Sequence, residues 1–539
     1  MRQRSVLGSF ARLLVCAGFA LGMQWLPAHL LLAMNCTVVH HPAPSEADSA
    51  FLAGDFAKAV ELYQAELAKN PGETEVVVGL VHSLLRQQKV MDAANAVHSF
   101  IGDKPASAAL LTLRGEVELR QGEPWNAAET AGASAKLDPC NPRTMLLFAR
   151  LAGLGSRYST ARKMLASAHQ LDPEDPEIRA AWMSGLPTAQ RIPETQAYLA
   201  GPRGDSKEDL SGMRTDLDEL KKWSEEPHRP CTLASQPASV EIPLSEIRSI
   251  RGFSSYTAMD VKVNDHRVRL SIDTSYNPRL PIEGVSGLLI LRSAAEHMGL
   301  KPLFQNQVAG TGSQGPRAGY VAYAESISIG GIEFRDCAVQ VMSGEFWNDA
   351  DGSISMSLLS DFLVTLDNPS HKLILGPLPA RPAGTSEGGL YDRYVAPEMK
   401  DYTPIYRSGS DLILPAAANG KYPMLLLLDT AVGYTVLSPL ASHGVAEGHK
   451  NSKYEVRGTG DPVDTAFSAG DVTLTFAAVN QYITHIGSFD TWMFSKDTGM
   501  EISGLIGDAT LRKLTIRIDY RDGLVKLDYD PKRTGAFAR

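Results

Sequence analysis

Two stretches of the chain, far apart in sequence, each run from an apolar strand directly into Asp-Thr and a small residue. The stronger is LLLLDTA, residues 425–431, and the weaker is VRLSIDTS, residues 268–275. A carboxylate at the end of a buried strand costs free energy unless something compensates it. One such Asp is usually a turn former or a cap. Two in matching surroundings predict a facing pair, which can act as general base and general acid around one water.

The surroundings of the two stretches match in order. A polar turn, Asn264-Asp265 or Asn419-Gly420, precedes each and predicts a hairpin whose second strand ends on the Asp. Each Asp is followed by an apolar strand, a short amphipathic helix and a Gly-Thr-Gly tripeptide, and each half closes with a polar turn and a last strand. This recurrence predicts a tandem duplication of a unit of roughly 120 residues.

The pattern resembles the retropepsin-like (pepsin-related) aspartic peptidases, in the bacterial form with two units fused in one chain. The resemblance runs from about residue 240 to the C-terminus, and it implies an all-β pseudo-dimer that cleaves peptide bonds. Asp273 and Asp429 match the catalytic aspartates of the family. The resemblance implies supporting roles around this pair for Thr274, Thr430, Ser275, Ala431 and Gly507.

The chain departs from the family pattern at the residue after each Asp-Thr. The family has Gly, which allows positive φ and close backbone approach, and this chain has Ser275 and Ala431. In the first half Ser355 also replaces the Gly of the apolar-Gly element. An alternative is therefore a catalytically impaired module that holds an extended peptide without cutting it.

Two hairpin tips are expected to act as flaps over the substrate. GTGSQG, residues 310–315, matches a dinucleotide-binding pattern but lies between strand patterns, so a hairpin tip is expected instead. The flap candidates are Thr311, Gly312, Ser313, Thr459, Gly460 and Asp461.

Upstream, small residues and prolines recur with a period of 34 residues. Alanines recur at 59, 93, 127 and 161, and prolines recur at 71, 105, 139 and 173. This period resembles the tetratricopeptide repeat (TPR), in which paired helices stack into an all-α solenoid. Such a solenoid offers a surface for a protein partner, or it serves only as a scaffold. Arg203-Gly204-Asp205, beyond the repeats, is expected to be a solvated loop.

The N-terminus is basic, MRQR, and precedes an apolar segment from about residue 13 to residue 34. This order predicts an export signal or an N-terminal membrane anchor, and hence a periplasmic or secreted protein of bacterial type. Asn35 before Cys36 argues against a lipoprotein site. The five cysteines are scattered and one lies in the apolar segment, so no disulfide is predicted.

Composition limits the remaining possibilities. The net charge of −9 and the lack of a Lys/Arg cluster argue against nucleic acid as a partner, and no motif calls for a cofactor or a metal. The expected partners are a peptide or protein substrate in the β cleft and a protein on the TPR surface. The predicted parts are a signal or anchor (1–36), TPR-like helices (45–185), a helical junction (186–239), the first peptidase unit (240–376), a linker (377–388) and the second unit (389–539).

Overall fold

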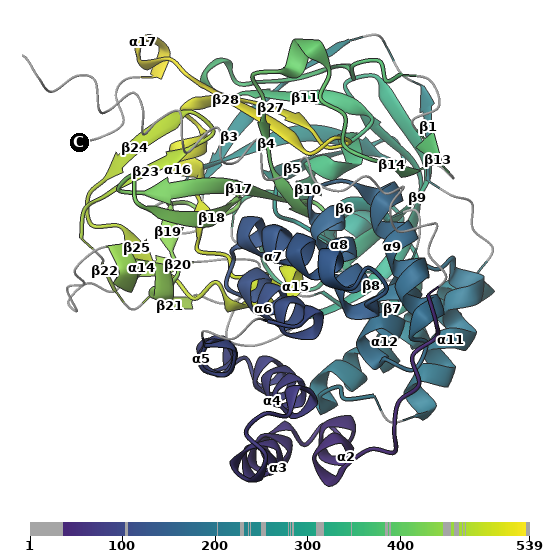
Figure 1. Ribbon diagram of the computed structural model, residues 1–539. Coiled ribbons are helices and arrows are strands. Elements are labelled where there is room, and N and C mark those ends of the chain that lie inside the picture. Colours follow the sequence, from purple (N-terminus) through teal and green to yellow (C-terminus); the bar gives the residue numbers. More distant parts are fainter. Residues whose placement is uncertain are drawn as a thin grey trace, which may run out of the picture. The chain divides into compact units, whose positions relative to one another are not determined.

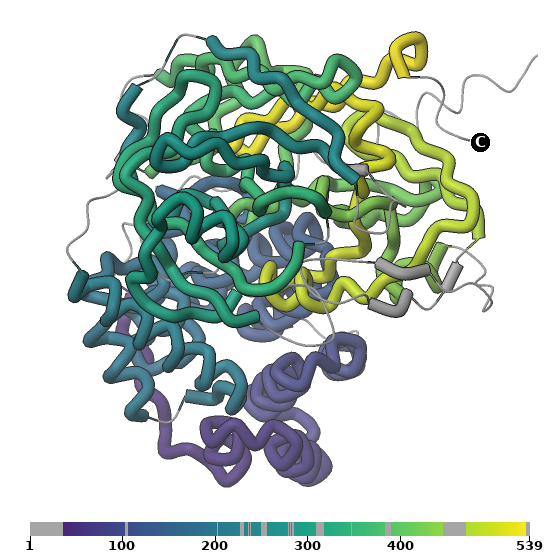
Figure 2. The backbone as a smooth tube through the Cα atoms, turned by 180° about the vertical axis from the view of Figure 1, so that it is seen from behind, coloured from purple at the N-terminus to yellow at the C-terminus, as the bar shows by residue number. Residues whose placement is uncertain are grey.

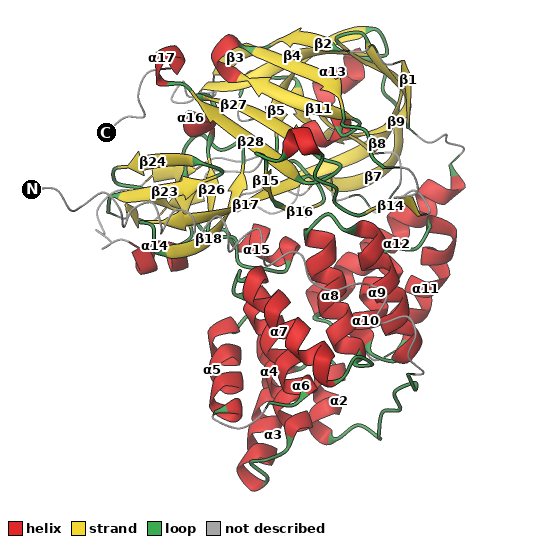
Figure 3. Ribbon diagram, turned by 45° about the horizontal axis from the view of Figure 1, so that its top comes forward, coloured by secondary structure: helices red, strands yellow, loops and turns green. Residues whose placement is uncertain are grey.

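The computed structural model describes residues 36–534, except for 103–105, 202, 227–230, 236, 238, 249–254, 279, 281, 283–284, 309–316, 347, 383–385, 388–389, 446–453, 457–462, 466 and 469. The chain divides into two compact units. One comprises the residues to Gly153 and Arg157–Arg214, and the other comprises Leu154–Ser156 and Thr215–Arg539. The first is helical and the second is rich in β-strands, as Figures 1 and 3 show, which confirms the expected fold class. Among the described residues, no helix is both long and apolar enough to cross a membrane.

The first unit consists of antiparallel helix pairs that follow the 34-residue period. Ala59, Ala93 and Ala127 are fully buried where paired helices meet, and Gly79 leaves room for the ring of Tyr63. The period also places charged partners in neighbouring repeats, since His82 bonds Glu116 at 2.7 Å, 34 residues away. The helices are α2 (Glu46–Leu52), α3 (Phe56–Lys69), α4 (Thr74–Arg86), α5 (Val90–Ile101), α6 (Ala108–Arg120), α7 (Pro124–Leu137), α8 (Pro142–Leu154), α9 (Tyr158–Leu171), α10 (Pro176–Ser184), α11 (Thr188–Ala200) and α12 (Lys207–Glu225).

The loop between α11 and α12 returns to the first repeat, so the prediction of a solvated Arg203-Gly204-Asp205 loop is wrong. The N–H groups of Arg203 and Gly204 donate to the carbonyl of Leu52 at 3.2 and 3.1 Å. Asp205 is buried, and it pairs with Arg86 at 3.3 Å and accepts from the Tyr198 hydroxyl at 2.6 Å. The loop therefore joins the two ends of this helical unit.

The prediction that the chain has no disulfide is also wrong. Cys36 is bonded to Cys140 in the helical unit, and Cys231 is bonded to Cys337 in the β-rich unit. The paired cysteines are 104 and 106 residues apart. Only the tertiary fold brings them together, and their spacing in the sequence carries no sign of it.

The β-rich unit contains two nine-stranded sheets with matching pairing. In the first, the central order is β9-β6-β10-β5-β4-β8, and in the second it is β25-β19-β26-β18-β17-β23. The first sheet comprises β1 (Thr232–Ser235), β3 (Ser245–Arg248), β4 (Ser255–Val263), β5 (His266–Asp273), β6 (Val285–Leu291), β7 (Pro302–Val308), β8 (Arg317–Ile329), β9 (Ile332–Met342) and β10 (Gly352–Ser355). The second comprises β16 (Tyr406–Ser408), β17 (Asp411–Ala418), β18 (Tyr422–Leu428), β19 (Val436–Leu437), β22 (Phe467–Ser468), β23 (Val472–Phe476), β24 (Val479–Ile483), β25 (Gly487–Ser488) and β26 (Gly504–Ile506).

The two hairpins expected before the Asp-Thr stretches are both present. β4 pairs with β5 across Asn264-Asp265, and β17 pairs with β18 across Asn419-Gly420. All four turn residues have positive φ, which is the conformation that a tight two-residue hairpin turn requires. Short helical elements follow in both halves: α13 (Arg292–His297), η2 (Met356–Leu359), η3 (Asn368–Ser370), η4 (Pro397–Met399), α14 (Pro439–Val445), α15 (Trp492–Thr498), α16 (Asp508–Leu511) and α17 (Pro531–Thr534).

A third sheet of six strands joins the two halves. Its order is β15-β28-β27-β11-β12-β2, and the central antiparallel pair is β11 from the first half and β27 from the second. Its strands are β2 (Val240–Pro243), β11 (Phe362–Asp367), β12 (Lys372–Pro377), β15 (Thr403–Pro404), β27 (Leu514–Asp519) and β28 (Leu524–Tyr529). Two further pairs are β13 (Ser386–Glu387) with β14 (Leu390–Tyr391), and β20 (Tyr454–Val456) with β21 (Val463–Thr465).

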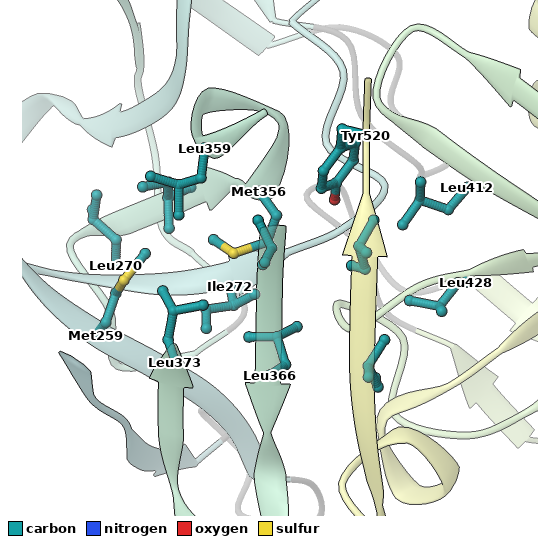
Figure 4. Packing of buried hydrophobic residues seen from close by; sticks show 14 of the residues in the cluster. Met259, Leu270, Ile272, Met356, Leu359, Leu366, Leu373, Leu412, Leu428 and Tyr520 are labelled. Carbon is teal, nitrogen blue, oxygen red and sulfur yellow. The ribbon is translucent and has the colours of Figure 1, made fainter. Parts of the chain in front are cut away.

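One apolar core runs through both halves and includes the residue before each Asp-Thr. Ile272 and Leu428, the residues before the two aspartates, are both buried in it (Figure 4). Seen from behind, the teal first half and the yellow-green second half of this unit lie side by side (Figure 2). The core and the shared sheet therefore hold the ends of β5 and β18 in fixed positions.

Candidate active site

Asp273 and Asp429 occupy equivalent places in the two halves. Asp273 is the last residue of β5, and Asp429 directly follows β18. Each of these strands has a parallel neighbour, β10 and β26 respectively. Each Asp therefore lies at the end of a strand that has a parallel neighbour, and a loop follows it directly.

Reciprocal hydrogen bonds between Thr274 and Thr430 tie the two loops together. The Thr274 hydroxyl donates to the carbonyl of Leu428 at 2.9 Å, and the Thr430 hydroxyl donates to the carbonyl of Ile272 at 2.8 Å. Each hydroxyl also accepts from the backbone N–H of the other threonine, at 3.1 Å in both directions. Residues 156 positions apart in the chain therefore share one buried, two-fold-like network.

Both carboxyl groups are buried, with exposed fractions of 4% for Asp273 and 2% for Asp429. Burial raises the pKa of Asp273 to about 6. Hydrogen bonds from the hydroxyl and N–H of Ser275 and from the N–H of Tyr276 lower this pKa and so oppose the effect of burial. Burial, and then the charge of Asp273, raise the pKa of Asp429 to about 7. The Thr274–Thr430 network brings the loops that carry the two carboxyls together, so the charge of one carboxylate opposes the ionisation of the other.

The residues that replace the family's glycine still bond the carboxylates through their backbone. The N–H of Ser275 donates to Asp273 Oδ1 at 3.0 Å, and the N–H of Ala431 donates to Asp429 Oδ1 at 2.8 Å. Neither residue has a positive φ, so a side chain is accommodated without backbone strain. The Ser275 hydroxyl adds a further bond to Asp273 Oδ1, also at 3.0 Å.

The residue opposite on the neighbouring strand explains why position 507 is glycine and position 355 is serine. A Cβ at Gly507 would lie 2.3 Å from the carbonyl carbon of Tyr434, so only glycine fits there. In the first half the partner is itself glycine, Gly287, and the Ser355 Cβ would lie 3.0 Å from a Cβ placed on it. In the second half the glycine is Gly507, which follows β26, and in the first half it is Gly287 of β6, opposite Ser355. Ser355 is therefore accommodated without disturbing the local packing.

The six flap candidates, from Thr311 to Ser313 and from Thr459 to Asp461, lie outside the described residues.

The structure adds Tyr276 and Ser410 as residues of the site that the sequence did not indicate. The Tyr276 hydroxyl donates to Gln340 at 2.5 Å, and the Ser410 hydroxyl of the second half donates to the carbonyl of Tyr276 at 2.7 Å. They anchor the loop after Asp273, and no local sequence signal distinguishes them from ordinary polar residues.

Within the part of the chain that the structure describes, no group of three or more His, Cys, Asp or Glu is placed to hold a metal ion. The residues brought together are instead two carboxyls, their backbone donors and one hydroxyl. This set can bind a water between the carboxyls and transfer protons.

Fold and site together define a protein with an N-terminal TPR region and an aspartyl protease domain. Residues 259–376, which include Asp273, match the model of the aspartyl protease family, and residues 78–142 match that of the tetratricopeptide repeat. No relative was found among curated proteins.

Two solved structures are among those similar to parts of the chain. A thermophilic TPR protein of Thermus thermophilus is 18% identical, with a TM-score of 0.26, and the match covers 32% of this chain and 95% of that one. An aspartic proteinase from Irpex lacteus is 12% identical, with a TM-score of 0.32, and the match covers 56% of this chain and 100% of that one.

Proposed function

We propose that the β-rich unit is an aspartic-type endopeptidase that cleaves an extended peptide or protein substrate. The observation that supports this most directly is the pair Asp273 and Asp429, buried on two loops that Thr274 and Thr430 hold together. The raised pKa values of about 6 and about 7 allow one proton to be shared at mildly acidic pH.

The proposed reaction needs one ionised and one protonated carboxyl. The ionised group takes a proton from a water as the water oxygen forms a bond to the peptide carbonyl carbon. The protonated group transfers its proton to the carbonyl oxygen, which gives a neutral gem-diol. The C–N bond then breaks as the first carboxyl gives the proton it took to the nitrogen and the second carboxyl takes a proton from one hydroxyl of the gem-diol. A carboxylic acid and an amine leave, and both carboxyls are back in their starting states.

A pH series of peptide cleavage tests the proposal. We expect the wild type to cleave at mildly acidic pH and to lose activity as pH rises past about 7, because ionisation of both carboxyls removes the general acid. Asp429→Asn and Asp273→Asn should each reduce cleavage by a factor of about 10³ or more. Cleavage that survives either substitution would exclude this site.

The second candidate is a peptide-binding module that does not cleave. The observation that favours it is the replacement of glycine by Ser275 and Ala431, with a hydroxyl placed on Asp273. Binding of a peptide library without cleavage at any pH from 3 to 8, by a folded wild type, would select this function.

The remaining proposals concern history, partners and location. We propose that the two halves arose by tandem duplication, which their matching strand orders support. The TPR region is proposed to bind a protein partner.

We also propose that the protein is exported to the periplasm or outside the cell, with the N-terminal segment as signal or anchor. The basic-then-apolar N-terminus supports this, as do the two disulfides, because disulfides persist in oxidising compartments. N-terminal sequencing of the mature protein, with thiol counting, tests this.

A further inference from the structure

The two Asp loops are nearly identical in their hydrogen bonds, apart from one hydroxyl. Asp273 accepts from the N–H of Ser275, and Asp429 accepts from the N–H of Ala431. The N–H of the next residue, Tyr276 or Val432, also favours the ionised carboxylate in each loop. Only the Ser275 hydroxyl, which donates to Asp273 Oδ1 at 3.0 Å, breaks this symmetry.

A hydroxyl has a single hydrogen to donate and lone pairs that can accept. In this geometry the Ser275 hydrogen points to Asp273, where it stabilises the carboxylate. Because this single hydrogen is committed to Asp273, the hydroxyl cannot donate to Asp429 at the same time, and the loop of Asp429 carries Ala431 in the equivalent position.

No other described titratable group next to the pair reproduces this asymmetry. Tyr276, on the loop after Asp273, and Tyr520, which follows β27, are the tyrosines whose pKa the charge of Asp273 affects. Burial, with the charge of Asp273 adding to it, raises the pKa of both, so both stay neutral in the working range. Arg407 lowers the pKa of Tyr520 and Asp411 raises it.

We propose that Ser275 is a positioning residue that assigns the proton within the pair, so that Asp273 is the general base and Asp429 is the general acid. The assignment rests on the proposed endopeptidase function. In the reaction above, Asp273 takes the water proton and Asp429 gives its proton to the carbonyl oxygen.

The test compares Ser275→Ala, which gives both loops the sequence Asp-Thr-Ala, with the wild type in pH profiles of kcat/KM. Without the hydroxyl the ionised Asp273 loses a charge-assisted bond, so the acidic limb should move up by about one pH unit. Ser275→Gly also lacks the hydroxyl and should shift the limb equally, which keeps the test decisive if the alanine variant folds poorly. An acidic limb that stays in place in a folded variant overturns the proposal.

Ala431→Ser provides the matched control. A hydroxyl on the second loop stabilises the ionised form of Asp429, so the alkaline limb should move to lower pH. The double variant Ser275→Ala/Ala431→Ser transfers the asymmetry to the other loop and should return the acidic limb toward its wild-type position. A double variant whose acidic limb stays at the Ser275→Ala position would contradict the assignment.

A stability measurement decides the proposal even if no variant cleaves any peptide. The loss of thermal stability caused by Ser275→Ala should grow as pH rises from 4 to 7, because the hydroxyl stabilises the ionised form of Asp273. In an Asp273→Asn background the same loss should be independent of pH. A loss that is constant with pH in both backgrounds indicates a merely structural serine and overturns the proposal, whereas absent cleavage alone would overturn only the endopeptidase function.

Discussion

At the scale of single residues, each half needs one glycine where two neighbouring strands approach closely, and the two halves carry this glycine on different strands of the pair. The sequence marked Ser355 as a departure because the family pattern places glycine there. Gly287, opposite Ser355, supplies the space that Gly507 supplies opposite Tyr434. A motif comparison along the chain could not reveal this, because the compensation lies across the sheet and depends on register.

The first prediction concerns Gly507→Ala. Its Cβ would lie 2.3 Å from the backbone carbonyl carbon of Tyr434, and backbone atoms cannot move aside as a flexible side chain can. We expect a loss in unfolding free energy of roughly 1–3 kcal/mol, as for overpacking of a core. Chemical denaturation measures it. Gly376→Ala, in β12 of the same unit, is the control, because a Cβ there would meet no atom within 4 Å, and it should change stability by less than about 1 kcal/mol. Equal losses for both variants would contradict this account.

The second prediction concerns Thr274→Val. Valine has no hydroxyl, so it leaves the carbonyl of Leu428 without its donor and the N–H of Thr430 without its acceptor. Two buried polar groups without partners should cost roughly 2–5 kcal/mol of unfolding free energy. Thr274→Ser keeps the hydroxyl and should retain most of the stability. If valine were tolerated as well as serine in denaturant unfolding, the hydrogen bonds would not be what holds the loops together.

At the scale of elements, those that could be predicted were the ones with a repeated local pattern. The 34-residue period predicted the helix pairs, and Asn264-Asp265 and Asn419-Gly420 predicted the hairpins that end on the aspartates. What could not be predicted was how distant edges join. The pairing of β11 with β27 and the return of residues 203–205 to the first repeat depend on partners far away in the chain. An apolar pattern indicates which face is buried, but it does not say what covers it.

The third prediction concerns the disulfide between Cys231 and Cys337. It joins the start of β1 to β9 and closes a loop of 106 residues, which restricts the unfolded chain. Replacing both cysteines by alanine should lower the unfolding free energy of the β-rich unit by roughly 2–5 kcal/mol. Denaturant unfolding followed by circular dichroism of the sheet signal measures the loss. The wild type under reducing conditions should show the same loss, and a reduced wild type as stable as the oxidised one would refute the prediction.

At the scale of the β-rich unit as a whole, the shared sheet and the continuous core bring two acids together at the seam between the halves. The same packing that stabilises the unit withdraws these carboxyls from water. Ionising them therefore opposes folding, and the proposed activity and the stability of the unit depend on the same protons.

The last prediction is a fall in stability with pH that the acid pair causes. The usual pKa of 3.8 is raised in the folded state to about 6 for Asp273 and about 7 for Asp429, so between these values the folded state binds more protons than the unfolded one. The contribution of the pair is therefore fully present below about pH 4 and is lost as pH rises through 6 to 7. Asp429→Asn removes one of these groups and the repulsion on the other. We expect this variant to match the wild type near pH 4 and to exceed its melting temperature by several degrees at pH 7.5, in thermal unfolding followed from pH 4 to 8. Asp429→Glu keeps the second charge and should retain the fall. Parallel pH curves for the wild type and Asp429→Asn would mean that the two acids do not share a buried site.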